Sequence, residues 1–244
     1  MNQATFQFHG NLNDFLPVKR RQIEFFSPIK EEGSVKDAIE SLGVPHPEID
    51  LVMVNGDAVG FDYRVKPGDR IVAYPYDPAR EPVPTVRPQP LIEARFVLDV
   101  HLGKLARYLR MLGFDALYQN DYDDETLADI SSQQRRILLT HDVGLLKRKI
   151  VDYGYWVRSP QPKQQVREVL SRFDLYKRVE PWTRCSRCNG LVMAVEKEVI
   201  RDRLPYYTAL SYHTFFKCKT CAQLYWKGAH YSRMQTLIED LSTA

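Results

Sequence analysis

The sequence predicts an α/β protein made of three parts, and three observations lead to this prediction. Strand and helix patterns alternate in the middle of the chain, which is typical of a mostly parallel sheet with flanking helices. Six of the fifteen prolines lie at 75–90 and separate this region from a smaller N-terminal part. Four cysteines in two C-x-x-C pairs mark a third part. We expect domains at 1–76, 93–178 and 179–244, with a linker at 77–92.

The composition is that of a folded protein with unevenly distributed charge. With 244 residues, 44% of them hydrophobic, the chain is long enough for two or three compact units. Its apolar runs are short, so we expect neither a signal peptide nor a membrane span, and a cytoplasmic location. Residues 1–74 hold 8 Lys and Arg against 11 Asp and Glu, whereas residues 91–244 hold 24 against 18. The basic second half favours a polyanionic partner.

The N-terminal part shows strand, helix and hairpin patterns. Apolar and polar residues alternate at 6–8, and a second apolar group at 23–26 is typical of another strand. Ser34 is placed to cap a helix whose apolar face lies within 35–42. Asn55-Gly56 then predicts a hairpin, because positive φ angles cost little at these two residue types.

Proline dominates the next segment. Because proline lacks a backbone N–H and restricts φ, it prevents regular helix and central strand. We therefore expect the linker at 77–92 to be extended and semi-rigid.

A strand and an amphipathic helix follow the linker. The strand pattern at 95–99 ends in Asp99, and the helix pattern at 102–113 is stopped by Gly113. The side chains expected to point inward are Leu102, Leu105, Leu109 and Leu112, and those expected to point outward are Lys104, Arg107 and Arg110. This arrangement predicts a helix packed on one face of the sheet.

The alternation of strands and helices continues to the end of the middle domain. We expect strands at 114–119, 136–142 and 155–159, and helices at 121–136 and 162–173. The strand at 136–142 ends in Asp142, and the first turn of the helix before it carries three acidic residues.

Acidic residues therefore lie where two strands end and where one helix begins. In open α/β sheets ligands bind outside the carboxyl ends of the strands, so Asp99 and Asp142 would emerge side by side if their strands are neighbours. Carboxylates gathered with those at 123–125 favour a hard cation, Mg²⁺ or Mn²⁺, as in metal-assisted phosphodiester hydrolysis. The simpler alternative is that Asp123 and Asp142 only cap the helices that they precede.

The cysteines give the most specific pattern in the sequence. Cys185 and Cys188 form one C-x-x-C pair, Cys218 and Cys221 the other, and 29 residues separate the pairs. Four thiolates in this pattern predict a tetrahedral structural Zn²⁺ in a ribbon, since a site closed by four ligands stabilises and does not catalyse. A thioredoxin-like redox role is the alternative.

The N-terminal part resembles a known fold in the segment at 54–75, VNGDAVGFDYRVKPGDRIVAYP. This segment is similar to the β-grasp, ubiquitin-like fold of sulfur-carrier proteins such as ThiS and the small subunit of molybdopterin synthase. Those carriers act through a free C-terminal Gly-Gly, whereas this chain has Tyr74-Pro75 there and continues. The resemblance therefore implies the fold without the carrier chemistry, and a docking or stabilising module with a possible protein partner.

The remainder of the chain resembles a nuclease family. It is similar to the C-terminal RNase domain first described in the nematode mutator exonuclease, a branch of the PIN-like nucleases. The matching segments are FVLDVHLGKLARYLRMLGFD, DDETL, RILLTHDVGLLKRK and WVRS. The resemblance covers residues 94–232, including the zinc ribbon, and members often carry a β-grasp module in front. It implies a PIN-like parallel sheet with flanking helices.

The resemblance also implies which carboxylates hold a metal ion. In PIN-like nucleases the ligands are an Asp closing the first strand, an acidic residue on a middle helix and an Asp closing a later strand. These positions correspond to Asp99, Asp124 and Asp142. Asp123 or Glu125 could replace Asp124, because positions at a helix start are uncertain by about one or two residues.

We therefore predict a metal-dependent ribonuclease that binds single-stranded RNA through basic and aromatic residues. The residues predicted to contact nucleic acid are Lys104, Arg107, Lys147, Arg148, Trp226 and Lys227. The alternative is a non-catalytic RNA-binding or adaptor protein with a vestigial pocket. The sequence leaves open RNA or single-stranded DNA, endo- or exonuclease action, one or two catalytic ions, and the oligomeric state.

Overall fold

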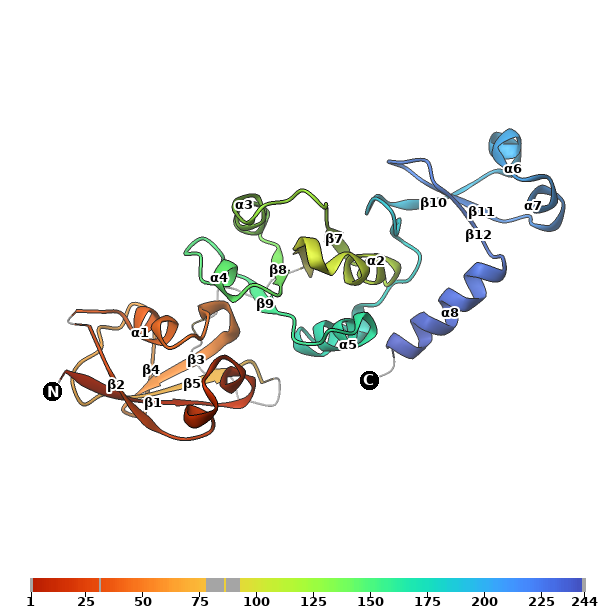
Figure 1. Ribbon diagram of the computed structural model, residues 1–244. Helices are drawn as coiled ribbons and strands as arrows, with labels where there is room; N and C mark the ends of the chain where they lie inside the picture. Colours follow the sequence, from red (N-terminus) through yellow and green to blue (C-terminus); the bar gives the residue numbers. More distant parts are fainter. Residues whose placement is uncertain (1, 31, 78–85, 87–92, 243–244) are drawn as a thin grey trace. The chain divides into compact units, whose positions relative to one another are not determined.

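A computed structural model of the protein describes residues 2–30, 32–77, 86 and 93–242 (Figure 1). The chain divides into two compact units. The first unit comprises Met1–Glu93 with Asp123–Trp156, and the second comprises Ala94–Tyr122 with Val157–Ala244. The predicted linker at 77–92 lies outside the described residues except for Asp77 and Val86. Val86 packs against the N-terminal core and donates its N–H to the carbonyl of Asp50 at 2.9 Å.

The N-terminal domain has the predicted β-grasp architecture. Its five-stranded sheet has the order β2-β1-β5-β3-β4, in which β1 and β5 are parallel and the other pairs are antiparallel. The strands are β1 (Gln3–Phe8), β2 (Phe25–Pro28), β3 (Ile49–Val54), β4 (Asp57–Val59) and β5 (Arg70–Pro75). The helices are α1 (Val35–Ser41) and the 3-10 turns η1 (Gly10–Phe15), η2 (Val18–Arg20) and η3 (His46–Glu48).

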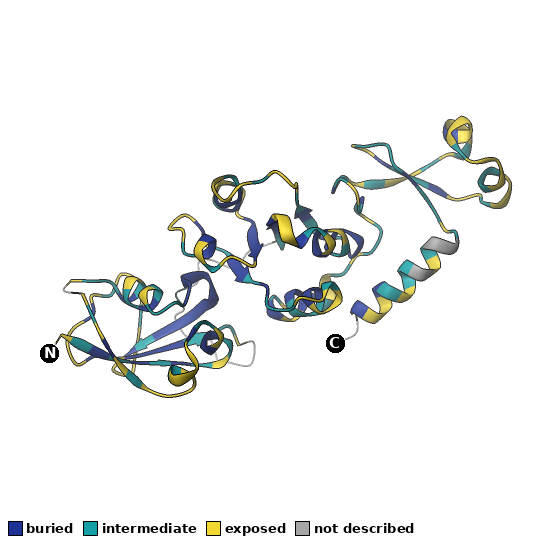
Figure 2. Cartoon of the chain, viewed as in Figure 1, coloured by how far each residue is buried: buried dark blue, intermediate teal, exposed yellow. Residues whose placement is uncertain are grey.

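Apolar periodicity explains why α1 packs on this sheet. Every second residue of β1 is buried, and the buried Val35 and Ile39 of α1 belong to the same core as Phe6 (Figure 2). The helix begins at a capping box: the Ser34 hydroxyl accepts the N–H of Asp37, whose carboxylate accepts the N–H of Ser34. The hairpin at Asn55-Gly56 has the expected positive φ angles of 54° and 97°.

The strand predicted at 23–26 is only partly correct. β2 begins at Phe25, and the side chains of Ile23 and Phe26 are 50% and 68% exposed. Two features explain the difference. Gln22 has a positive φ that turns the chain, and in this edge strand Ser27, not Phe26, is the residue that points inward.

The middle part contains the predicted parallel strands with helices between them. In its four-stranded sheet, β6 (Arg95–Leu98) pairs in parallel with β7 (Asp115–Leu117), and β8 (Ile137–Thr140) pairs in parallel with β9 (Gly154–Trp156). The helices are α2 (Gly103–Met111), α3 (Asp124–Gln134), α4 (Val143–Leu146) and α5 (Pro162–Arg172), with the 3-10 turns η4 (Val100–Leu102) and η5 (Tyr176–Arg178). This confirms the predicted fold class.

Helix α2 follows the prediction on its apolar face and departs from it at one residue. All four leucines expected inward are buried. Arg110, expected outward, is also buried: it donates from Nε to the carbonyl of Ala116 at 2.8 Å and from Nη1 to that of Arg187 at 3.0 Å. Burial lowers the pKa of Arg110, although the nearby cysteine and aspartate side chains oppose this shift. The prediction was wrong because a segment distant in sequence covers this side of the helix.

The C-terminal part is a three-stranded antiparallel ribbon with a helical excursion. Its strands, in the order β10-β11-β12, are β10 (Val192–Val195), β11 (Phe215–Cys218) and β12 (Leu224–Trp226). Between the first two strands lie α6 (Lys197–Ile200), η6 (Arg201–Arg203) and α7 (Tyr206–Ser211), and α8 (Ala229–Ser242) follows the ribbon. Ile200, Phe215 and Leu224 form its small core. Among the described helices, none combines the length and the apolar character needed to cross a bilayer.

Candidate functional site

Asp142 lies two residues after the last residue of β8 and is the N-cap of helix α4. Its backbone N–H donates to the hydroxyl of the buried Thr140 at 2.8 Å, and its Oδ1 accepts the N–H of Gly144 at 2.6 Å. The side chain is exposed. A Cβ at position 144 would lie 3.0 Å from Oδ1, so glycine allows the close approach of this carboxylate to the helix start. The capping role considered from the sequence is therefore present, and it uses one of the two carboxylate oxygens.

The acidic residues at the start of α3 have different local roles. Asp123 is the N-cap, and its Oδ1 accepts the N–H of Thr126 at 2.8 Å. This hydrogen bond lowers the pKa of the Asp123 carboxyl, and the charge of Arg148 contributes in the same direction. Asp124 and Glu125 follow in the first turn and are exposed. Within the described chain, neither carboxylate of these two residues has a hydrogen-bond or ion-pair partner.

Asp99 directly follows β6, in the second unit. It is 6% exposed, and its Oδ1 accepts the N–H of His101 at 2.8 Å at the start of η4. Tyr118 stabilises this turn by donating its hydroxyl to the carbonyl of Val100 at 3.0 Å. Asp99 is thus a buried carboxylate at the carboxyl end of a strand, as the sequence predicted.

The structure gathers the predicted ligands to different degrees. The four cysteines come together, as described below. Asp123, Asp124, Glu125 and Asp142 share the first unit, and no three of these described carboxylates form a group of the kind that the cysteines form. Asp99 belongs to the second unit. The joint role of Asp99, Asp124 and Asp142 therefore remains a prediction.

The predicted basic contacts lie in different environments. Lys104 and Arg107 are exposed on α2, and Arg148 is exposed after α4. Lys147 instead donates from Nζ to the carbonyl of Glu40 in the N-terminal domain, at 2.9 Å. The sequence contained no signal for this last contact, because the two residues are 107 positions apart.

The four cysteine sulfurs form a compact cluster. Their Sγ atoms all lie within 4.8 Å of one another, with 3.4 Å between Cys188 and Cys218 and 3.6 Å between Cys185 and Cys221. Sulfurs at the corners of a tetrahedron with a metal–sulfur distance of about 2.3 Å would be about 3.8 Å apart, whereas a disulfide needs about 2.05 Å. The cluster therefore fits a Zn²⁺ site and contains no disulfide.

Backbone groups around the cluster favour the thiolate form of one cysteine. Burial would raise the pKa of Cys218, but the N–H groups of Cys221 and Thr220 point at its sulfur and lower its pKa to about 7. The hydroxyl of Tyr225 lies 3.0 Å from the Cys185 sulfur. Hydrogen bonds of this kind orient metal ligands, so the chain supplies both the ligands and their supporting groups.

The aromatic residues of the ribbon are partly structural. Trp226 is half-buried against the ribbon core. Lys227 is exposed, and its Nζ lies 5.6 Å above the ring of Tyr231, which itself stacks on Trp182 at 4.5 Å. Of the two ribbon residues predicted to contact RNA, Trp226 and Lys227, the lysine is therefore the more accessible.

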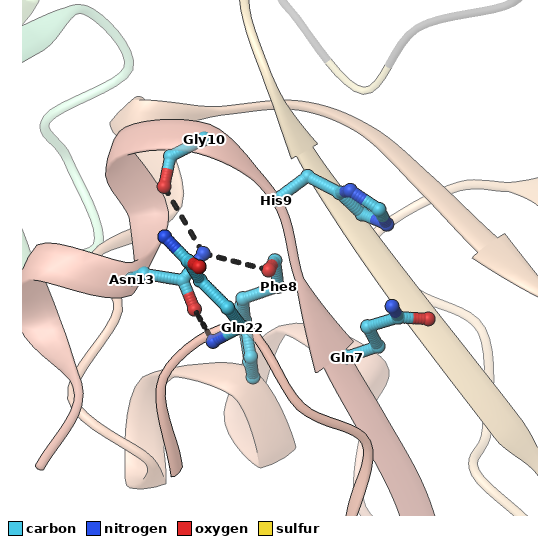
Figure 3. A pocket seen from close by; sticks show the side chains of 6 residues that line it. All are labelled: Gln7, Phe8, His9, Gly10, Asn13 and Gln22. Carbon is cyan, nitrogen blue, oxygen red and sulfur yellow. Dashed lines mark hydrogen bonds between the residues drawn. The ribbon is translucent and has the colours of Figure 1, made fainter. Parts of the chain in front are cut away.

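A pocket of about 230 Å³ lies beside β1 in the N-terminal domain (Figure 3). It is lined by Gln7, Phe8, His9, Gly10, Asn13 and Gln22. The Asn13 amide donates to the carbonyls of Phe8 and Gly10 and accepts the N–H of Gln22 at 2.6 Å. These hydrogen bonds hold neighbouring parts of the chain together, and the pocket volume is below the range of about 300–1,000 Å³ that is usual for ligand sites. The pocket therefore fits a structural role.

The fold and the cysteine cluster define the class of protein: an α/β protein with a ubiquitin-like domain, a parallel sheet with acidic strand ends, and a cysteine metal ribbon. Residues 94–238 match the family model of the Mut7-C RNAse domain, and residues 1–81 match that of the Mut7-C ubiquitin domain. Since the first match covers more than half of the chain, the protein belongs to the Mut7-C RNAse domain family. The family and the fold predicted from the sequence are thus confirmed.

Comparisons beyond the family models add little. No curated protein matches the sequence. The chain is similar to the small archaeal modifier protein 1 of H. volcanii, known from a crystal structure, with 15% identity and a TM-score of 0.25 over 31% of this chain and 98% of that one. These values are too low to support a conclusion about function.

Proposed function

We propose that this protein is a ribonuclease that depends on Mg²⁺ or Mn²⁺, with Asp99, Asp124 and Asp142 as the ligands of the ion. The observation that carries the proposal is the match to the Mut7-C RNAse domain, which spans all three residues. Carboxylates are the donors that these hard cations prefer, so the set fits the ion. When bound, the ion would polarise the phosphate and activate water for phosphodiester hydrolysis.

The local geometry supports Asp124 over Asp123 as the middle ligand. Asp123 uses its carboxylate to cap α3, whereas the exposed Asp124 has no partner within the described chain. Asp142 uses only the Oδ1 atom of its carboxylate to accept the N–H of Gly144. A carboxylate with an unused oxygen can bind a metal without giving up its local hydrogen bond, which favours Asp142 for both roles.

We further propose that the substrate is single-stranded RNA, bound with help from the zinc ribbon. Exposed cations on α2 and after α4 suit phosphate contacts, and Lys227 offers another beside the aromatic pair of Trp182 and Tyr231. The four free cysteines fit Zn²⁺ and a reducing compartment such as the cytoplasm. A protein partner of the ubiquitin-like domain is compatible with this activity.

A direct test is cleavage of labelled single-stranded RNA and DNA by the zinc-loaded protein with Mg²⁺, Mn²⁺ or EDTA. We expect metal-dependent cleavage of RNA that Asp142→Asn abolishes while RNA binding persists. Asp129→Asn is the matched control, since Asp129 is an exposed acidic residue of α3 outside the proposed ligand set. Equal activity of Asp142→Asn and wild type would refute the proposed site.

One observation favours the adaptor alternative. Asp99, Asp123 and Asp142 each accept a backbone N–H at the start of a helix or turn, so each has a structural role that needs no metal ion. On this alternative, the wild-type protein would bind RNA without cutting it, whichever divalent ion is added.

A further inference from the structure

The ubiquitin-like domain contacts the segment that carries Asp142 through Trp156. Trp156 ends β9, and its ring lies 5.1 Å from the ring of Phe15 at the end of η1. Its backbone N–H donates to Oε1 of Glu48 at 2.7 Å. Glu48 is completely buried, so this hydrogen bond fixes the end of β9 against the N-terminal domain.

The same tryptophan reaches the residue next to Asp142. Its indole Nε1–H donates to the carbonyl of His141 at 3.0 Å. The peptide that joins His141 to Asp142 is therefore bonded to an indole ring that packs on Phe15, and the backbone of the same tryptophan is bonded to Glu48. The N–H of Asp142 is bonded to Thr140 on its other side, so the backbone that carries this carboxylate is fixed at two points.

A second contact fixes the far end of α4. Lys147 follows this four-residue helix, and its ammonium group donates to the carbonyl of Glu40 near the end of α1. A cation is stabilised at the carboxyl end of a helix, where carbonyl groups point outward. The Glu40 carboxylate is itself anchored by Nδ1 of His46 at 2.7 Å. A helix as short as α4 needs such contacts to hold one orientation.

From these contacts we propose that Trp156 is a positioning residue for Asp142 and that the ubiquitin-like domain holds Trp156 in place. The N-terminal domain is then part of the nuclease machinery in the same chain, in addition to any partner that it binds. This inference rests on the proposed function, since it concerns the orientation of a metal ligand. Groups that orient metal ligands are typically worth roughly 10-fold to 100-fold in activity or metal affinity.

The test uses full-length variants of residues outside the proposed metal ligands and outside the predicted RNA contacts. Phe15→Ala removes the ring behind Trp156, Phe15→Leu retains apolar volume, and Phe26→Ala removes an exposed aromatic ring of β2 as a control. Two quantities are measured: kcat and KM for RNA cleavage, and the hydrogen-exchange rate of the Gly144 amide, which donates to Asp142. Circular dichroism verifies that each variant is folded.

We expect Phe15→Ala to lower kcat roughly 10-fold to 100-fold with little change in KM, and to speed exchange at Gly144. Phe15→Leu should restore most of both quantities, and Phe26→Ala should match wild type. If Phe15→Ala does not fold, Trp156→Phe replaces it, because this change removes the indole donor to His141 and keeps an aromatic ring at the position. A folded variant with wild-type kcat and wild-type exchange at Gly144 overturns the inference.

The two proposals fail in different ways. If wild type cleaves no RNA with any divalent ion, the ribonuclease proposal fails, and the exchange rate at Gly144 alone decides whether Phe15 and Trp156 position the Asp142 segment. If wild type cleaves RNA and the Phe15 and Trp156 variants match it in kcat and in exchange at Gly144, the ribonuclease proposal stands and the positioning role is refuted.

Discussion

Asn189 in the first cysteine pair's loop hydrogen-bonds to Ala116 in β7: its Oδ1 accepts the N–H of Ala116 at 3.0 Å. Its Nδ2 donates to the carboxylate of Asp115 at 2.7 Å. Asn189 has a positive φ of 68°, which asparagine tolerates better than most residues. The cysteine ribbon is thus joined to β7 by a buried side chain.

Replacing Asn189 should therefore weaken the nuclease domain as well as the ribbon. Asn189→Gly keeps the backbone conformation and leaves the buried N–H of Ala116 unpaired, which we expect to cost about 1–3 kcal/mol of unfolding free energy. Asn189→Ala should cost about 1–3 kcal/mol more, because alanine is strained at positive φ. Denaturant unfolding of both variants measures the two contributions. Equal stability of Asn189→Gly and wild type would show that the bond contributes nothing.

The two neighbouring acids at the start of α3 should differ in effect. Asp124→Asn is expected to abolish Mn²⁺-dependent RNA cleavage with little change in stability, because its exposed carboxylate has no hydrogen-bond or ion-pair partner within the described chain. Asp123→Asn should leave cleavage nearly unchanged, since asparagine caps helices as well as aspartate does. The measurement is kcat for both variants beside their unfolding curves. The reverse order of activities would assign the role of metal ligand to Asp123 in place of Asp124.

Zinc removal should destabilise the C-terminal part. We expect one zinc ion per chain by atomic absorption, and Cys218→Ser should lower this content because the site loses one of its four thiolates. A chelator should lower the thermal midpoint of the wild type and have little further effect on the variant. Full zinc content in Cys218→Ser would contradict a four-cysteine site.

The capping box of α1 gives a pH dependence of known sign. The hydrogen bond from the Ser34 side chain lowers the pKa of the Asp37 carboxyl below its ordinary value of 3.8. The stabilisation is therefore fully present above pH 3.8 and is lost as the pH falls through the lowered pKa of the folded state. Ser34→Ala should cost about 1 kcal/mol at neutral pH and less in acid, whereas Ser34→Asn should retain the cap. Urea unfolding at several pH values tests this, and a pH-independent difference would exclude it.

Gly113 and Gly68 allow the cost of a steric clash after α2 to be measured apart from the cost of backbone strain. Gly113 has a φ of +97°, and a Cβ there would lie 2.2 Å from the carbonyl oxygen of Glu180. Gly68 has a similar φ of +88° with nothing within 4 Å of the added Cβ. Both alanine variants lose about 1–3 kcal/mol from backbone strain, and Gly113→Ala should lose more because of the clash. Equal thermal midpoints of the two alanine variants would show that the segment around Glu180 moves to make room for the added Cβ.

Local sequence patterns predicted the elements of this fold because burial follows helix and strand periodicity. The leucines of α2, the cap at Ser34 and the hairpin at Asn55-Gly56 all have signals within a few residues. The four cysteines were equally predictable, since few folds other than a metal ribbon need two C-x-x-C pairs.

The missed features depend on segments far apart in the chain. Arg110 has the spacing of an exposed residue, and one of the two carbonyls that accept its hydrogen bonds, that of Arg187, lies 77 positions away. Lys147 has the sequence pattern of a solvent-exposed cation, but it donates to the carbonyl of Glu40, which lies 107 positions away. No sequence motif predicts the hydrogen bonds of Asn189 with Ala116 and Asp115. The proposed ligand set of Asp99, Asp124 and Asp142 is likewise predicted only from strand ends and from the family. No local sequence pattern reports the distances between residues of three separate elements.

The hydrogen bond from Trp156 to Glu48 also affects how this chain behaves among its own copies. A strand that ends a sheet exposes donors that can pair with a strand of another molecule, which is a common start of aggregation. At Trp156 the donor is occupied by a buried carboxylate, and an incoming strand would find neither a free N–H nor a tolerable place for its own carbonyl. Glu48 therefore occupies one of the backbone donors through which β9 could pair with a strand of another molecule.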